Sequence, residues 1–176
     1  MNADNITLEP VAIGQKEILR NLLEKYDYEF SQYEDNDVND LGLFGYDYLD
    51  YYWTEKNRWA FFIRVEGKLA GFAMVNDFPE SERRTDYCLS EFFILYKYRR
   101  CGLGSYVARW LWDRFPGSWH LKYHPHNLPS VEFWNRAVNS YTGGKFERLE
   151  GDIEATKYRD GTQGMLLFFD TTSASA

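Results

Sequence analysis

The feature that most restricts the fold of this chain lies in residues 89–115, where an apolar run leads through a glycine-containing loop into a helical pattern. Residues 89–95 (LSEFFIL) predict a strand. The loop that follows contains Gly102 and Gly104, and apolar side chains then recur at helical spacing as far as Phe115. A helix that begins directly after such a loop leaves its first main-chain N–H groups unpaired. The segment therefore indicates a sheet flanked by helices, with an anion site where the helix begins.

The rest of the chain supplies the other elements of such a sheet. Glu66-Gly67 separates two β-type runs and favours a tight hairpin, because glycine tolerates the positive φ of such a turn. Helices are expected over 15–30 and 45–53, before Pro116-Gly117, and from Asn127 to Gly143-Gly144. Strands are expected over 6–12, 58–65, 68–75, 89–95, 118–123, 145–149 and 165–169.

The order of these elements predicts a mixed α/β (α+β) fold, because hairpins come first and a βαβα unit follows. The chain has 176 residues, which is the length of one domain with an ordinary core. We expect a single domain over 1–170. Residues 171–176 (TTSASA) are expected to form a disordered tail.

Composition and charge exclude several classes of protein. With 27 Asp and Glu against 20 Lys and Arg, the net charge of −7 argues against binding nucleic acid through bulk electrostatics. No apolar run is long enough for a transmembrane helix, so we expect no membrane partner. The first ten residues, MNADNITLEP, show no secretory signal, and the expected location is cytoplasmic.

Cysteines and histidines suggest no metal site at the level of sequence. Cys88 and Cys101 stand in no metal-binding spacing and are expected to be free thiols. His120, His124 and His126 follow the pattern His-x3-His-x-His, but no cysteine lies nearby and a proline separates the last two. We interpret them as ordinary histidines near a strand end and expect no metal.

Three explanations of the loop at 99–104 can be compared from its residues. A Walker A loop is excluded, because no Gly-Lys-Ser/Thr follows. A dinucleotide fingerprint is excluded, because Val107 stands where the third glycine would be. A tight strand-to-helix turn with no ligand is the simplest explanation of two glycines alone.

A resemblance to the GNAT (GCN5-related) N-acetyltransferase superfamily favours a ligand. Arg99-Arg100-Cys101-Gly102-Leu103-Gly104 is similar to the Arg/Gln-x-x-Gly-x-Gly/Ala loop of that family, and Glu91-Phe92-Phe93-Ile94 resembles its fourth strand. Asn127-x-x-Ser130-x-x-Phe133-Trp134 resembles the start of its following helix. The resemblance covers nearly the whole chain. It implies a splayed mixed β-sheet of about six to seven strands, flanked by about four helices.

The resemblance also implies a cosubstrate and the residues that hold it. Acetyl-CoA would place its pyrophosphate against main-chain N–H groups after Arg99, and the Ile94 N–H would donate to the thioester oxygen. Asn127 would either contact the pantetheine arm or cap the helix. The implied cofactor-binding residues are Ile94, Arg99, Arg100, Cys101, Gly102, Leu103, Gly104, Ser105 and Asn127.

The implied reaction is N-acetyl transfer to a primary amine by direct attack in a ternary complex. Glu91 is the candidate general base, because a carboxylate is unusual in an apolar strand; the alternative is a carboxylate that faces solvent or pairs with an arginine. Trp134 stands where the family often has a tyrosine as general acid, and Tyr141 is a weak substitute. A non-catalytic module that binds CoA or an acyl-CoA is the alternative function.

The acceptor is expected to bind against residues 26–55, which are acidic and aromatic. No Lys or Arg occurs between Lys25 and Lys56. Carboxylates attract cationic amines and aromatic faces bind ammonium groups, so a small-molecule or peptide amine fits this stretch. A solvated acidic loop over a core or a dimer contact explains the same composition. A homodimer is possible.

Overall fold

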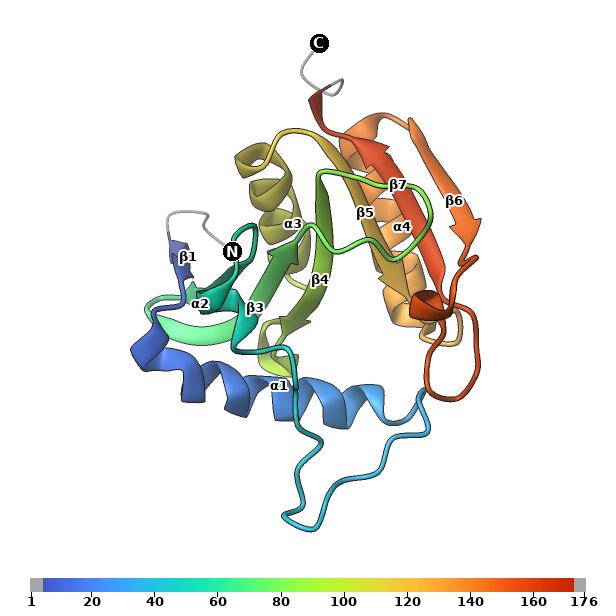
Figure 1. Cartoon of the computed structure of the whole chain (residues 1–176). Coiled ribbons are helices and arrows are strands. Elements are labelled where there is room, and N and C mark those ends of the chain that lie inside the picture. Colours follow the sequence, from blue (N-terminus) through green and yellow to red (C-terminus); the bar gives the residue numbers. More distant parts are fainter. Residues whose placement is uncertain (1–4, 173–176) are drawn as a thin grey trace. The chain divides into compact units, whose positions relative to one another are not determined.

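The computed structural model describes residues 5–172, and its contacts divide the chain into two compact units. The first unit comprises the residues up to Val75 together with Glu91–Val107, and the second comprises Asn76–Ser90 and the residues from Ala108 onward. Hydrogen bonds join the strands in the order β1-β2-β3-β4-β5-β7-β6 (Figure 1). The strands are β1 (Ile6–Pro10), β2 (Trp59–Val65), β3 (Lys68–Asn76), β4 (Tyr87–Ile94), β5 (Ser118–Tyr123), β6 (Phe146–Glu150) and β7 (Met165–Asp170).

The first unit is built on an antiparallel meander of β1, β2 and β3. The β2–β3 hairpin turns at Glu66 (φ 51°) and Gly67 (φ 74°), as the sequence predicts. Helix α1 (Lys16–Phe30) buries one apolar stripe against β2, β3 and β4. The core of this unit includes Leu19, Leu22, Leu23, Phe62, Phe72, Met74 and Phe93.

Strand β4 ends in very close contact with β3. A Cβ atom added to Gly71 would lie 2.0 Å from the carbonyl oxygen of Phe93, so only glycine fits there. The Leu95 N–H donates to the Ala70 carbonyl at 2.8 Å and holds the residue that follows the strand. The end of β4 is therefore positioned by main-chain contacts with its neighbour.

The second unit places β5, β7 and β6 beside the first residues of β4. Strand β5 runs parallel to β4 and pairs with it over Tyr87–Leu89, whereas β7 is antiparallel to both β5 and β6. Successive side chains of these strands point to opposite faces of the sheet. On one face, the rings of Trp119 and Phe169 stack with their centroids 6.4 Å apart, and Trp112 of α3 (Leu103–Arg114) packs on Phe169. Helix α4 (Leu128–Thr142) also contacts β6 and β7.

Residues 5–172 thus contain a mixed seven-stranded sheet and four α-helices, which confirms the predicted fold class. Helix α2 (Tyr51–Thr54) is shorter than the predicted helix over 45–53. The expected tail is wrong at its first residue, because Thr171 is buried and exchanges hydrogen bonds with Gly117. Residues 173–176 lie outside the described residues.

None of the helices among residues 5–172 is both long enough and apolar enough to cross a membrane.

Candidate active site

The loop that joins β4 to α3 has the main-chain geometry of an anion site. Arg100 (φ 62°) and Gly102 (φ 85°) adopt left-handed conformations, which turn the chain sharply before Leu103 begins the helix. Within residues 5–172, the N–H groups of residues 100–105 have no hydrogen-bond acceptor, and the first bond of the helix is donated by Tyr106 to the Gly102 carbonyl. A Cβ at Gly102 would meet no atom within 4 Å, so the space in front of this turn is open. The loop presents a set of donors at the positive end of a helix dipole.

Arg99 holds the start of this loop against its own unit. Its Nε donates to the Ile94 carbonyl at 2.7 Å, and its Nη2 donates to both carboxylate oxygens of Glu29, at 2.8 and 2.7 Å. Its guanidinium also lies 5.4 Å from the centre of the Phe93 ring. The Arg99 side chain thus joins the end of β4 to α1. Its charge is paired with Glu29, which the sequence did not indicate.

Glu91 lies near the middle of β4, with its side chain partly buried. Tyr46, from the segment between α1 and α2, donates its hydroxyl hydrogen to Glu91 Oε1 at 3.0 Å. The hydrogen bond fixes the direction of the carboxylate. It also brings the acidic, aromatic segment to the strand that carries the candidate base.

A cavity of about 610 Å³ lies within the first unit, beside the end of β4. Its wall is formed by α1, by the loop that follows α1, and by Phe93, Leu95 and Tyr96. Glu24 and Glu29 contribute carboxylates to this wall. A volume of this size is typical of sites for small molecules.

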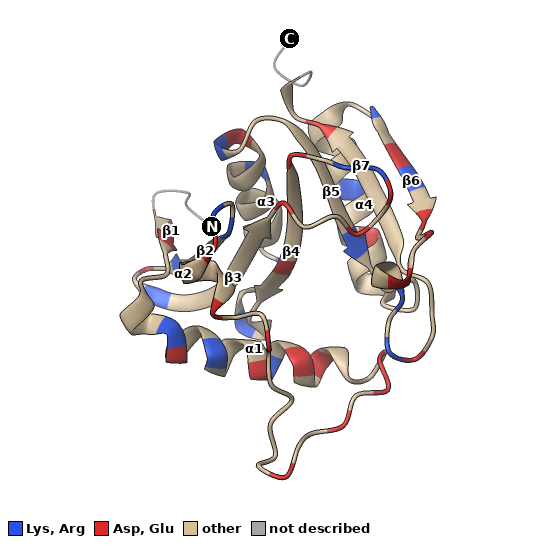
Figure 2. Ribbon diagram, viewed as in Figure 1, with Lys and Arg blue, Asp and Glu red and all other residues tan. Residues whose placement is uncertain are grey.

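Some carboxylates of the acidic stretch already accept hydrogen bonds from other residues of the protein. Figure 2 shows acidic positions along the second half of α1 and in the loop after it. Glu24 accepts main-chain hydrogen bonds from Phe44 and Gly45, both at 2.9 Å, and so anchors the loop. Tyr52 is buried in the core, whereas Tyr48 is 59% exposed. The aromatic residues of this stretch therefore divide between core and surface.

The remaining predicted residues belong to the second unit. Asn127 caps α4, because its Oδ1 accepts from the Ser130 N–H at 3.2 Å. Trp134 is buried in α4. Tyr141 lies in the last turns of α4 rather than in the following loop, and it donates to Asp113 Oδ1 at 2.7 Å. Burial and this hydrogen bond raise the pKa of Tyr141, which makes it a poor proton donor.

Sequence reasoning missed three residues that shape this site: Tyr46, Glu29 and Gly71. Tyr46 and Glu29 stood in the stretch assigned to the acceptor, but no spacing rule connects them with Glu91 or Arg99. A glycine inside an apolar strand was the available signal for Gly71, because such a residue marks a close approach of two main chains.

Solved structures with the same fold support this description. An acetyltransferase from Thermus thermophilus has a TM-score of 0.65 and 16% identity, covering 97% of this chain and 99% of its own. A spermidine N-acetyltransferase from Vibrio cholerae, in complex with CoA and spermine, has a TM-score of 0.64 and 10% identity, covering 98% and 99%. AAC(6')-Ib, in complex with ribostamycin and coenzyme A, has a TM-score of 0.66 and 12% identity, covering 97% and 96%.

No curated protein matches the sequence significantly. The model of the acetyltransferase (GNAT) family matches residues 17–138, which is more than half of the chain and contains β4, the loop after it and α3. The chain belongs to the acetyltransferase (GNAT) family and is an enzyme that uses acetyl-CoA.

Proposed function

We propose that this enzyme transfers the acetyl group to a primary amine of a small molecule or peptide, by direct attack in a ternary complex. The observation that carries the proposal is the loop at 99–105, where unpaired main-chain donors follow a strand that holds a carboxylate near its middle. Membership of the acetyltransferase family favours this function over the alternative of a protein that binds CoA or an acyl-CoA without catalysis.

Residues 100–105 would bind the pyrophosphate of the cosubstrate through their N–H groups. The open space in front of Gly102 and the positive end of the α3 dipole fit an anion. Pairing of β4 with β5 covers only Tyr87–Leu89, which fits an extended pantetheine arm along the later residues of β4. The Ile94 N–H would donate to the thioester oxygen, where negative charge develops.

Glu91 is the proposed general base. An alkyl ammonium has a pKa of about 10.4, so the acceptor must lose a proton before it attacks the thioester. Tyr46 holds the Glu91 carboxylate in place at 3.0 Å. Glu91 would take the proton from the amine, directly or through one water molecule.

The leaving thiolate would depart without a protein acid. Trp134 has no acidic proton for this step, and the Tyr141 proton is held by Asp113. A thiolate is a fair leaving group, because an ordinary thiol has a pKa of about 8.5. We therefore assign no general acid.

The acceptor would occupy the cavity beside β4. Aromatic and apolar residues form much of its wall, and Glu24 adds a carboxylate beside Lys25, whereas the charge of Glu29 is paired with Arg99. Similar folds belong to a spermidine N-acetyltransferase and to a ribostamycin-bound AAC(6')-Ib, and both ligands are amines. These properties favour an acceptor with more than one amino group.

Two measurements test the proposed function. Thermal shift with acetyl-CoA, CoA and ATP should show stabilisation by the two CoA species only. Thiol release from acetyl-CoA should then be measured with spermidine, spermine, ribostamycin and a lysine-containing peptide. Release with at least one amine is expected. Binding of CoA without release across a wide amine panel would favour the non-catalytic alternative.

A further inference from the structure

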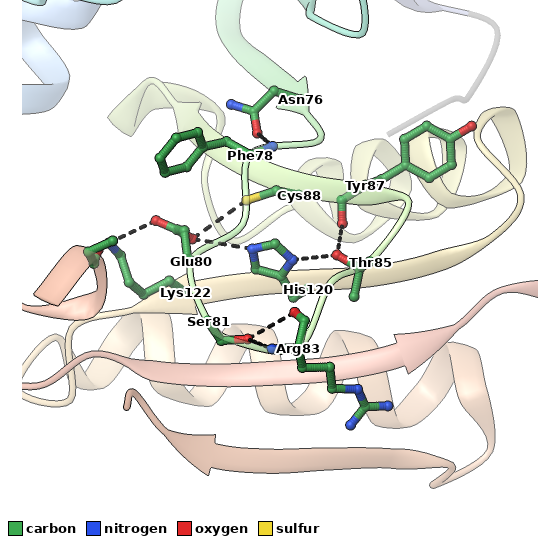
Figure 3. A network of polar contacts seen from close by, with 11 residues as sticks. Asn76, Phe78, Glu80, Ser81, Arg83, Thr85, Tyr87, Cys88, His120 and Lys122 are labelled. Carbon is green, nitrogen blue, oxygen red and sulfur yellow. Dashed lines mark hydrogen bonds and ion pairs between the residues drawn. The ribbon is translucent and has the colours of Figure 1, made fainter. Parts of the chain in front are cut away.

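The second unit contains a buried cluster of three side chains that can each supply one ligand to a metal ion. Cys88 on β4 and His120 on β5 are register partners in the parallel pair, so their side chains lie next to each other on one face of the sheet. Glu80 comes from the loop 77–86, which joins β3 to β4 and passes over this face (Figure 3). The ligand atoms of these three residues lie within 4.8 Å of one another.

The contacts of the Thr85 hydroxyl are compatible with a proton on His120 Nδ1, which is the tautomer that a metal at Nε2 requires. The Thr85 hydroxyl has one hydrogen, which it donates to the Tyr87 carbonyl at 3.0 Å. With the ring proton on Nδ1, His120 donates to the same hydroxyl oxygen at 2.6 Å, and both contacts of the Thr85 hydroxyl are satisfied. In the neutral ring, Nε2 is then the atom with the free lone pair.

His120 Nε2 is buried and has no hydrogen-bond partner, in a residue that is 1% exposed. The nearest charged atom is Glu80 Oε2 at 3.7 Å, which is beyond hydrogen-bond distance. Burial and the nearby Lys122 lower the pKa of His120, whereas the Glu80 carboxylate raises it. A buried acceptor nitrogen without a hydrogen-bond donor costs folding free energy. His120 Nε2 lies beside the Glu80 carboxylate and the Cys88 thiol.

We propose that Glu80, Cys88 and His120 bind a divalent metal ion of the zinc class. Tetrahedral Zn²⁺ with one sulfur, one nitrogen and one oxygen ligand places these atoms roughly 3.3–3.6 Å apart. Cys88 Sγ lies 3.5 Å from Glu80 Oε2, and His120 Nε2 lies 3.7 Å from the same oxygen. Cys88 Sγ and His120 Nε2 lie within 4.8 Å of each other, so the ligand atoms would draw together when an ion binds. The mixed donor set suits Zn²⁺ better than Mg²⁺ or Ca²⁺, which take oxygen ligands.

The residues around the cluster orient the ligands as outer-shell partners do in metal sites. Thr85 fixes the His120 ring, and Lys122 binds the second carboxylate oxygen of Glu80, Oε1, at 2.8 Å. The Glu80 oxygen that faces the cluster is thereby held toward Cys88 and His120. The Glu80 side chain is 17% exposed, which gives the ion and the fourth ligand, water, a route from solvent.

Binding would replace a proton with the metal ion. The Cys88 thiol donates to Glu80 Oε2 at 3.5 Å. When the ion binds, the S–H bond breaks, the sulfur–metal bond forms and the proton leaves to solvent. Because the three ligands come from β4, β5 and the loop 77–86, the ion would fasten that loop to the sheet.

The site is tested with full-length protein that has been treated with a chelator, desalted and kept reduced. Titration with Co²⁺ should give a thiolate-to-metal charge-transfer band that saturates at one equivalent, and Zn²⁺ should displace the Co²⁺. Cys88→Ser should abolish the band, and Glu80→Gln should weaken Zn²⁺ binding in a competition assay. Thr85→Val, which removes the hydroxyl that contacts His120 and the Tyr87 carbonyl, should weaken Zn²⁺ binding about 10–100-fold.

The other cysteine and a second histidine provide matched controls. Cys101→Ser and His126→Ala should keep the band and the stoichiometry of one, and circular dichroism should show that every variant is folded. Absence of a band in the unmodified protein would overturn the proposal. A band that survives Cys88→Ser, or that disappears in Cys101→Ser or His126→Ala, would equally overturn it. These readouts do not depend on acetyl transfer.

Discussion

Among the polar groups without partners in residues 5–172, two sets are of opposite kinds. The loop at 99–105 leaves main-chain N–H donors at a largely exposed turn. The cluster of Glu80, Cys88 and His120 leaves an acceptor nitrogen in the interior. Exposed donors cost little, because water satisfies them until an anion arrives. A buried lone pair is costly unless a cation or a proton occupies it.

The comparison indicates that the charge of a ligand follows from whether the unpaired groups are hydrogen-bond donors or acceptors. Donors at a helix N-terminus select an anion, which agrees with a pyrophosphate at the loop. Nitrogen, sulfur and oxygen lone pairs that converge select a metal cation. The donors of the loop lie at the surface, where an anion can reach them. The lone pair of His120 lies in the core, and its availability depends on which ring nitrogen carries the proton.

The largest expected effect is the loss of CoA binding in Gly102→Glu. The substitution places a carboxylate against the pyrophosphate and forces a side chain into a residue with φ 85°. We expect affinity to fall at least about 100-fold, which corresponds to roughly 2.7 kcal/mol, in isothermal titration calorimetry. Gly161→Glu is the control, because Gly161 has the same φ of 85° and lies in the second unit. Unchanged affinity in Gly102→Glu would break the assignment of the donors to an anion.

The next effect separates chemistry from binding within the first unit. Glu91→Gln keeps the shape of the side chain but removes the proposed base, so turnover should fall about 100-fold or more near neutral pH while CoA affinity changes little. The loss should shrink at high pH, where the amine is already deprotonated. Tyr46→Phe, which removes only the hydrogen bond to Glu91, should have a smaller effect. Equal rates for Glu91→Gln and the parent enzyme across pH would exclude Glu91 as the base.

A third substitution tests how firmly the end of β4 must be positioned. In Gly71→Ala the new Cβ would lie 2.0 Å from the Phe93 oxygen, so the two strands must separate. We expect the free energy of unfolding to fall by about 1–3 kcal/mol in urea titration, with a loss of activity. Gly14→Ala should be nearly neutral, since no atom lies within 4 Å of its added Cβ. A Gly71→Ala protein as stable and active as the parent would show that β4 tolerates displacement.

The smallest effect concerns the loop that carries Glu80. Hydrogen bonds from the Ser118 hydroxyl and N–H to Asp86 lower the pKa of its carboxyl group. The stabilisation from this carboxylate is present above the ordinary pKa of about 3.9 and is lost as pH falls through the lower folded value. Asp86→Asn should therefore cost about 1 kcal/mol or less at neutral pH, because the group is exposed. The difference from the parent should vanish once the pH lies below the lowered pKa of Asp86, and CoA affinity should not change. A difference that persists there would refute the charge-based explanation.

Most of the fold could be predicted from sequence because local signals were strong. The Glu66-Gly67 hairpin, the stripe of α1 and the cap at Asn127 each depend on residues close in the chain. The predicted helix over 45–53 was too long. Tyr46 binds Glu91 and Tyr48 is exposed to solvent, and neither belongs to α2. Thr171 was assigned to a tail, although its bonds to Gly117 depend on a strand pairing that composition does not reveal.

The candidate site could be predicted only where its residues are consecutive in the sequence. The loop at 99–105 is continuous, so its donors were visible as a motif. The pairing of Arg99 with Glu29 and the meeting of Cys88 with His120 depend on packing and strand register. The histidine spacing directed attention to neighbours in sequence, whereas the partners of His120 come from β4 and from the loop before it. No local pattern contains that information.

The segment between α1 and α2 is tethered by Glu24, which binds Phe44 and Gly45, and by the hydrogen bond from Tyr46 to Glu91. Val38 and Leu43, which line the cavity, stand outside the strands and belong to neither the cosubstrate loop nor the core. Mutations at such positions can alter the choice of acceptor without refolding the enzyme. Selection for new amines would accordingly leave its trace in this one segment while the framework stays constant.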